Sequence, residues 1–216
     1  MTPQIKICGV NDAAFAVRAA EAGVDYLGFI FVEKSPRRVV PEQARTIIAA
    51  VRSAVSVKAP RRQVRVPRFV GVFVSHSAAE VAEIAAGAAL DVVQLHGDYG
   101  ADDVAALKAA GLEVWRLAPG SGDEPAGEDA VLIDGRDGSR SGGTGRLADW
   151  SQVAALKRSG RRVVLAGGIS AENISAAAAT GADVLDVNSS LETSPGVKSL
   201  VLLDRLAAAI KRATTF

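Results

Sequence analysis

The segment Thr180-Gly181-Ala182-Asp183-Val184-Leu185 decides the fold, because its pattern occurs three times along the chain. The other two copies are Ala22-Gly23-Val24-Asp25-Tyr26-Leu27 and Ala89-Leu90-Asp91-Val92-Val93. Each copy contains a helix end, a short pair of residues, an aspartate and then the start of an apolar strand. The repeat therefore predicts a chain built from successive strand–helix units.

Apolar runs rich in valine and isoleucine alternate with longer, alanine-rich segments along the whole chain. This alternation is typical of a parallel sheet covered by helices. The predicted strands are Gln4–Cys8, Tyr26–Phe31, Phe69–Val74, Val92–Leu95, Glu113–Leu117, Ala130–Ile133, Arg162–Ala166 and Val184–Val187. The predicted helices are Asp12–Ala22, Pro41–Val55, Ala78–Gly87, Ala101–Ala110, Ala148–Ser159, Ala171–Thr180 and Val197–Ala213.

Eight strands in a chain of 216 residues favour a closed barrel over an open doubly wound sheet. The fifth connection, residues 118–129, is rich in glycine and proline and gives no clear helix. We therefore expect an α/β protein whose residues 1–216 form one (β/α)8 TIM-barrel domain with a short or irregular fifth helix.

The composition excludes several classes of function. Lys and Arg number 25 against 24 Asp and Glu, so long-range attraction gives no reason to expect a nucleic-acid or membrane partner. An anionic ligand must then be held locally. The basic stretch Arg61–Arg68 has no interleaved aromatic residues and favours a solvated loop over a nucleic-acid site. With two histidines, His76 and His96, and one cysteine, we expect neither a metal nor a cofactor.

The single cysteine, Cys8, also excludes an intramolecular disulfide, as is usual in a reducing cytoplasm. The first residues show no secretory signal, and no stretch approaches the roughly 20 apolar residues that span a bilayer. We expect a cytoplasmic protein that is a monomer or a homodimer and acts on a small molecule.

In β/α barrels the working residues lie where the strands end, and Cys8 ends the first predicted strand. A lone buried cysteine is commonly an inert small apolar residue. However, Gly9 leaves room for a ligand, and Lys6 lies on the same strand face. A cation there is expected to lower the thiol pKa from about 8.5 and to favour a thiolate base.

Asp134 ends the sixth predicted strand, where the apolar run Val131-Leu132-Ile133 stops at a carboxylate. One interpretation is a helix cap or a solvated loop residue. The other is a general acid in a partly desolvated barrel mouth, where burial raises a carboxyl pKa. A thiolate and a carboxylic acid would then face each other across one cavity.

Further candidates would bind an anionic ligand. Arg37 follows Ser35-Pro36 and is either a surface residue or a two-point grip for a carboxylate. Gly167-Gly168 lies at a helix start after the seventh strand, which is the usual phosphate locus of this architecture.

Two features of the sequence allow more than one interpretation. The loop 135–145, with Gly142-Gly143-Thr144-Gly145, is either a flexible linker or a lid over the site of Asp134. It matches neither a Walker A loop nor a dinucleotide fingerprint. His96 is either a catalytic group or, as we favour, a structural hydrogen-bonding residue at the end of the fourth strand.

An ordered set of short motifs runs along the chain. Its segments are Lys6-Ile7-Cys8-Gly9, Gly28-Phe29-Ile30-Phe31, Ser35-Pro36-Arg37-Arg38-Val39, Val93-Gln94-Leu95-His96-Gly97, Gly142-Gly143-Thr144-Gly145, Asp149-Trp150, Leu165-Ala166-Gly167-Gly168, Glu172-Asn173 and Pro195-Gly196-Val197-Lys198. Each segment is weak alone, whereas the ordered set covers essentially the whole chain and resembles the phosphoribosylanthranilate isomerase family.

The resemblance implies an aldose–ketose isomerase of tryptophan biosynthesis that needs no cofactor. Its reaction is the Amadori rearrangement of N-(5-phosphoribosyl)anthranilate to 1-(2-carboxyphenylamino)-1-deoxyribulose 5-phosphate. By resemblance, Asp134 protonates the ring oxygen, Cys8 removes the C2′ proton and Arg37 holds the anthranilate carboxylate. The phosphate would be bound by Gly143, Gly167, Gly168, Ser189 and Ser190.

The chain departs from the family pattern at three places. The last strand of the family usually ends Asp-Val-Ser-Ser-Gly and here reads Asp186-Val187-Asn188-Ser189-Ser190. Ser190 therefore crowds the phosphate, strains the backbone or adds a hydroxyl donor. In addition, Arg146 replaces the usual lysine and Ala148 the usual phenylalanine.

Three other hypotheses remain at this point. An indole-glycerol-phosphate lyase or synthase would share the phosphate half but lack the Cys8-Gly9 strand end and the Ser35-Pro36-Arg37 loop. A dual-substrate isomerase that also serves histidine biosynthesis would have aspartate in place of Cys8. A phosphosugar-binding regulator without turnover is the third, prompted by Asn188 and Ser190.

Overall fold

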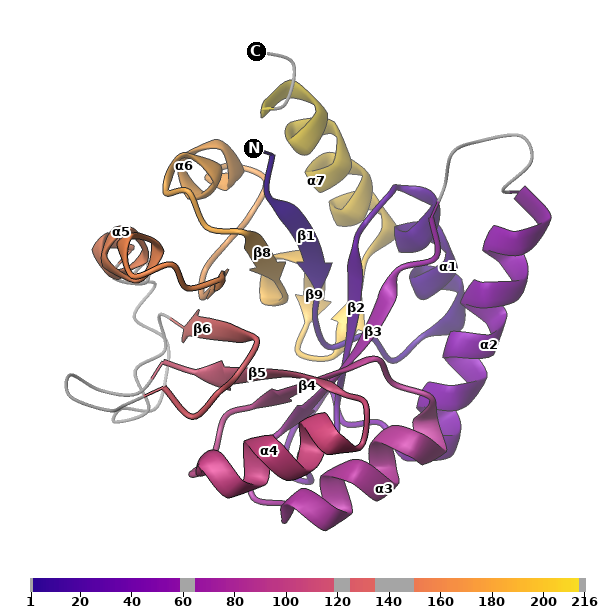
Figure 1. Ribbon diagram of the computed structural model, residues 1–216. Coiled ribbons are helices and arrows are strands. Elements are labelled where there is room, and N and C mark those ends of the chain that lie inside the picture. The colour runs from indigo at the N-terminus through magenta and orange to yellow at the C-terminus, as the bar shows by residue number, and fades with distance from the viewer. Residues whose placement is uncertain (1, 59–64, 119–124, 135–149, 214–216) are drawn as a thin grey trace.

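The structure is a computed structural model that describes residues 2–58, 65–118, 125–134 and 150–213. Eight parallel strands close into a barrel in chain order, with β1 pairing both β2 and β8 (Figure 1). They are β1 (Gln4–Ile7), β2 (Tyr26–Ile30), β3 (Arg68–Phe73), β4 (Val92–Leu95), β5 (Glu113–Leu117), β6 (Ala130–Asp134), β7 (Val163–Ala166) and β8 (Val184–Val187). The predicted TIM barrel is confirmed, and each strand lies within one residue of its predicted bounds.

The helices surround the barrel (Figure 1). They are α1 (Ala13–Glu21), α2 (Pro41–Lys58), α3 (Ala78–Ala88), α4 (Ala101–Ala109), α5 (Ser151–Arg158), α6 (Ile174–Ala179) and α7 (Leu200–Ala213). Between β5 and β6, the described residues 118 and 125–129 contain no helix.

Three predicted helix boundaries are wrong by three residues each. α2 ends at Lys58 instead of Val55, α6 begins at Ile174 instead of Ala171, and α7 begins at Leu200 instead of Val197. Val197–Lys198 instead forms β10, which pairs antiparallel with β9 (Glu192–Ser194) after the 3-10 turn η1 (Ser189–Leu191). The amide and carbonyl groups of residues 197–198 therefore bond across a hairpin rather than along a helix.

An aspartate precedes each even-numbered strand and binds the backbone of the strand before it. Each of these carboxylates accepts a hydrogen bond from a backbone amide in the first half of the preceding strand. The pairs are Asp25 with Ile5 (2.8 Å), Asp91 with Phe69 (2.8 Å), Asp129 with Val114 (2.9 Å) and Asp183 with Val163 (2.8 Å). The sequence repeat thus satisfies backbone donors at the amino end of the barrel, where the ladder supplies no partner.

The buried apolar side chains form two layers, one outside the barrel strands and one inside the barrel. The larger layer lies between strands and helices and includes Phe29, Ile48 and Leu165. The smaller one fills the barrel interior with side chains such as Tyr26 and Trp115, whose rings lie 5.0 Å apart edge to face. These side chains fill the barrel interior, and in barrels of this kind the working site lies at the carboxyl ends of the strands.

Candidate active site

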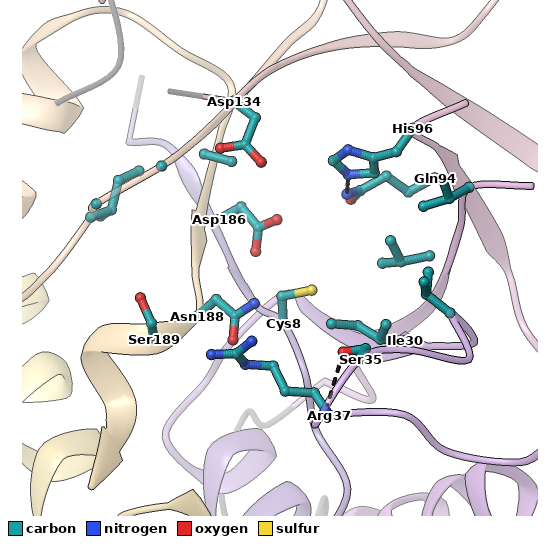
Figure 2. A pocket seen from close by; sticks show the side chains of 17 residues that line it. Cys8, Ile30, Ser35, Arg37, Gln94, His96, Asp134, Asp186, Asn188 and Ser189 are labelled. Carbon is teal, nitrogen blue, oxygen red and sulfur yellow. Dashed lines mark hydrogen bonds between the residues drawn. The ribbon is translucent and has the colours of Figure 1, made fainter. Parts of the chain in front are cut away.

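A cavity of about 270 Å³ opens at the carboxyl ends of the strands (Figure 2). Its lining residues come from most strand ends and the loops that follow them. They are Cys8, Ile30, Val32, Ser35, Arg37, Val72, Val74, Gln94, His96, Asp134, Ala166, Gly167, Gly168, Ile169, Asp186, Asn188 and Ser189. Polar groups converge on one side, whereas Ile30, Val32 and Val72 form an apolar wall.

Cys8 and Asp134 lie in this one cavity. Cys8 directly follows β1, and Asp134 is the last residue of β6, so their backbones come from different parts of the barrel. Both side chains line the cavity, and Figure 2 shows the Asp186 carboxyl group between Asp134 and Cys8. The arrangement places a potential proton acceptor and a potential proton donor around a common space.

Lys6 lowers the pKa of the Cys8 thiol as expected, but the net shift of that pKa is upward. Burial raises the pKa of the Cys8 thiol above its ordinary value, and the nearby Lys6 ammonium offsets only part of that rise. Lys6 Nζ lies 2.6 Å from Asp186 Oδ2, and the carboxylate of Asp186 itself raises the pKa of Cys8. Asp186 therefore counters part of the effect of Lys6 on the thiol.

Asp186 is a cavity residue that the sequence did not single out. It lies inside β8, is 6% exposed and lines the cavity beside Cys8 (Figure 2). Its Oδ1 is buried and has no hydrogen-bond partner among the residues that the structure describes. Burial raises the pKa of Asp186. The signal that was available is the strand alternation, which places residues 184, 186 and 188 on one face.

Arg37 lines the cavity but is held by the protein itself. Its Nε and Nη2 donate to Glu192 Oε1 and Oε2, both at 2.7 Å. The Arg37 amide donates to Ser35 Oγ at 3.2 Å, which fixes the start of the side chain. The bidentate grip expected for a ligand carboxylate is thus made to Glu192 in this structure.

The β9–β10 hairpin supplies a buried ionic cluster under Arg37. Lys198 Nζ lies 3.0 Å from Glu192 Oε1 and donates to Asn188 Oδ1 at 2.9 Å. The side chains of Glu192 and Lys198 are only 3% and 1% exposed. Gly196 (φ +85°) has no space for a side chain, since a Cβ would lie 2.5 Å from the Pro36 carbonyl oxygen. The hairpin therefore packs closely on the loop of Arg37.

Gly167 and Gly168 form a bend whose backbone angles are rarely adopted by residues other than glycine. Their φ angles are +90° and +71°, and both residues line the cavity together with Ser189. Successive glycines at such angles leave backbone amides accessible to an anion. Asn173 secures the segment by donating from Nδ2 to the Gly168 carbonyl at 2.9 Å.

Ser190 takes a supporting position beside this bend. Its hydroxyl donates to the Ile169 carbonyl at 2.7 Å, and its backbone stays outside the left-handed region. The backbone-strain alternative is therefore excluded. Gly143, the motif Gly142–Gly145, Arg146 and Ala148 lie outside the described residues.

His96 follows β4 and lines the cavity, with its Nε2 2.5 Å from Gln94 Nε2. An amide nitrogen only donates, so this contact suits a neutral ring that accepts at Nε2. Burial lowers the pKa of His96 to about 4, despite the opposing effect of Asp134. His96 is therefore an uncharged group near neutral pH.

The described residues contain no group of three or more His, Cys, Asp or Glu side chains placed to hold a metal. In the described part of the chain, no helix is both long and apolar enough to cross a membrane. The protein is thus a β/α-barrel whose cavity brings a thiol and a carboxyl group together beside a double-glycine bend.

Comparison with known proteins identifies the family. The family model described as N-(5'phosphoribosyl)anthranilate (PRA) isomerase matches residues 5–209. An N-(5'-phosphoribosyl)anthranilate isomerase of Pseudomonas putida is 36% identical over 214 residues, covering 96% of this chain and 97% of its own. The crystal structure of the Thermus thermophilus phosphoribosyl anthranilate isomerase superposes with a TM-score of 0.81 at 31% identity, covering 97% of this chain and 98% of its own.

The chain belongs to the N-(5'-phosphoribosyl)anthranilate isomerase family and is an isomerase of tryptophan biosynthesis that acts on a phosphosugar. A relative from Vibrio cholerae, the tryptophan biosynthesis protein TrpCF, is 41% identical over 201 residues, which cover 89% of this chain and 39% of that protein. A phosphoribosyl anthranilate isomerase solved in complex with reduced 1-(o-carboxyphenylamino)-1-deoxyribulose 5-phosphate has a TM-score of 0.75 at 27% identity, covering 97% of this chain and 99% of its own.

Proposed function

We propose that Cys8 is the general base and Asp134 the general acid of the Amadori rearrangement. The observation that carries this proposal is their common position in the cavity, from β1 and β6. The two groups differ in chemistry, so one can donate while the other accepts. Cys8 is only 5% exposed and lines the cavity, so its sulfur faces the space where the sugar would lie.

The reaction proceeds in two proton transfers before the product forms. Asp134 donates a proton to the furanose ring oxygen, which breaks the C1′–O bond and leaves a protonated Schiff base at C1′. Cys8, as thiolate, then removes the C2′ proton, and the electron pair forms the C1′–C2′ double bond of an enolamine. Tautomerisation gives the 2-ketose. Each positioned acid or base contributes about 10² to 10⁴-fold to such a rate.

The ends of the substrate are held by different parts of the cavity. Arg37 binds the anthranilate carboxylate. That carboxylate either shares the guanidinium with Glu192 or takes the place of Glu192 as its partner. The phosphate is placed at Gly167, Gly168 and Ser189, where positive φ angles leave backbone amides accessible. Ser190 supports this bend through the Ile169 carbonyl, and Gly143 completes the phosphate site.

The test follows the fluorescence of freshly generated phosphoribosylanthranilate. The wild-type protein should deplete the substrate well above background, whereas Cys8→Ser and Asp134→Asn should each turn over at least a hundredfold more slowly. Circular dichroism and melting curves check that both variants fold. Near-normal turnover in either variant would remove that residue from its role.

Compartment and assembly are part of the same proposal. A single cysteine that works as a base must stay reduced, which favours the cytoplasm. All the residues assigned above come from one chain, so a monomer or a homodimer would be equally competent. Light scattering coupled to size-exclusion chromatography decides between these two states.

A further inference from the structure

The rearrangement leaves one proton transfer without an assigned group. When the enolamine becomes a ketone, C1′ gains a proton and the hydroxyl on C2′ loses one. Cys8 holds the proton taken from C2′ and can return it to C1′, because the two carbons are adjacent. The hydroxyl proton needs a separate acceptor, and Asp134 ends its own step deprotonated and must recover a proton.

Asp186 has the position of that acceptor. Its Oδ2 is occupied by Lys6 Nζ at 2.6 Å, whereas its Oδ1 is buried without a partner in the described part of the chain. The side chain lines the cavity, and Figure 2 shows it between Asp134 and Cys8. A buried carboxylate oxygen without a hydrogen bond is costly unless a ligand supplies the donor.

We propose that Asp186 Oδ1 accepts a hydrogen bond from the substrate hydroxyl on C2′ and takes its proton as the ketone forms. The step breaks the O–H bond, turns the C–O bond into the carbonyl and protonates C1′ from the Cys8 thiol. The proton on Asp186 then passes to the Asp134 carboxylate. All three groups return to their starting forms, so charge and protons balance over the cycle.

The surroundings of Asp186 suit a transient proton acceptor. Burial and the neighbouring Asp134 both raise its pKa, which brings the carboxylate closer to the strength a proton acceptor needs. Lys6 is fully buried and donates to the other carboxylate oxygen, Oδ2, so the orientation of Oδ1 is fixed. Lys6 is thus a positioning residue for Asp186.

The inference rests on the proposed roles of Cys8 and Asp134, and the test separates the two. The reaction is run in heavy water, and mass spectrometry measures deuterium at C2′ of recovered substrate against product formed. In Asp186→Asn, Cys8 still removes the C2′ proton, its thiol exchanges with solvent, and the enolamine returns to substrate. We expect product formation to fall at least tenfold, with the ratio of exchange to product rising above that of wild type.

Two further variants guard against misfolding and charge effects. Asp186→Asn leaves Lys6 buried without a counter-ion, so the double variant Lys6→Gln/Asp186→Asn removes both charges and should show the same rise in the exchange ratio. Asp183→Asn breaks another lysine–aspartate pair, with Lys157, at the amino end of β8 and should leave both readouts at wild-type values.

Each outcome is assigned in advance. Product formation within a few-fold of wild type in the folded variants overturns the inference. Slow product formation without an increased exchange ratio also overturns it, because Asp186 would then act before proton removal at C2′. If Cys8→Ser still exchanges C2′ and forms product, the proposed base is wrong, and that result is independent of Asp186.

Discussion

Arg37 and Glu192 form a two-point ion pair at the rim of the cavity, with both N–O distances at 2.7 Å. The same carboxylate lies 3.0 Å from Lys198 Nζ, and the Glu192 side chain is 3% exposed. A guanidinium that is held on two of its nitrogens is oriented before any ligand arrives. Glu192 of the β9–β10 hairpin thus orients Arg37, a cavity-lining residue, without lining the cavity itself.

Glu192→Gln should weaken substrate binding more than turnover. The amide keeps the size of the side chain but removes the charge that orients Arg37 and neutralises Lys198. We expect KM to rise several-fold with a smaller change in kcat. The free energy of unfolding should fall by about 1–3 kcal/mol, measured by urea denaturation. Glu83→Gln, at an exposed position of α3, is the matched control. An unchanged KM in a destabilised variant would mean that Glu192 supports the hairpin alone.

The raised pKa of Cys8 predicts an alkaline rise in activity. The thiolate is the active form, and its fraction grows with pH, so kcat/KM should increase as pH rises. Since burial raises the folded-state pKa, the inflection should lie above the ordinary thiol value of about 8.5. Substrate fluorescence between pH 6 and pH 10 measures this profile. An inflection below pH 7 would show that the free enzyme holds Cys8 as thiolate.

The sequence was sufficient to predict the strand ends. Cys8 and Asp134 stand where apolar runs stop, and in a parallel barrel all such stops gather at one mouth. Asp186 was missed because it lies inside the run Val184–Val187, where its two apolar neighbours hide the inward-facing position. Alternation identifies such a residue only once the closed barrel fixes which face is interior.

Contacts between distant segments were beyond the sequence. The pKa of Cys8 rises chiefly because the thiol is buried, and Asp186, which is 180 positions from its partner Lys6, adds to that rise. Likewise, Glu192 reaches Arg37 across 155 positions through a short hairpin that has no apolar periodicity. Local patterns report which residues end a strand, whereas charge balance in the cavity depends on closure of the whole barrel.

His96 should make the fold sensitive to acid. Its folded-state pKa of about 4 lies below the unfolded value of about 6.5, so the unfolded chain binds more protons between these limits. Stability is complete above pH 6.5 and falls as pH drops towards 4. Between pH 7.5 and pH 4.5 this histidine should account for a loss on the order of 2–3 kcal/mol.

Urea denaturation of wild type and His96→Gln at these two pH values measures that contribution. The variant should lose less stability than wild type on acidification, by the amount assigned to the imidazole. His76→Gln controls for the removal of a histidine outside the cavity lining. Equal acid sensitivity in wild type and His96→Gln would contradict a buried, neutral His96.

Arg162 should stabilise the barrel without affecting catalysis. At the amino end of β7 its Nη2 donates to Tyr26 Oη at 2.7 Å and to Gln4 Oε1 at 2.9 Å, and its Nη1 lies 2.5 Å from Glu113 Oε1. These partners belong to three other strands, and a lysine ammonium cannot reach them all. Arg162→Lys should cost about 2–3 kcal/mol.

In melting curves that cost should lower Tm by roughly 4–12 °C for a chain of this size. Both kcat and KM should stay at wild-type values, because the cavity opens at the opposite end of the strands. Arg158→Lys, at an exposed position of α5, provides the matched control and should change neither stability nor activity. A loss of activity in Arg162→Lys at unchanged Tm would contradict this prediction. It would show that contacts at the amino end of the barrel affect catalysis rather than stability.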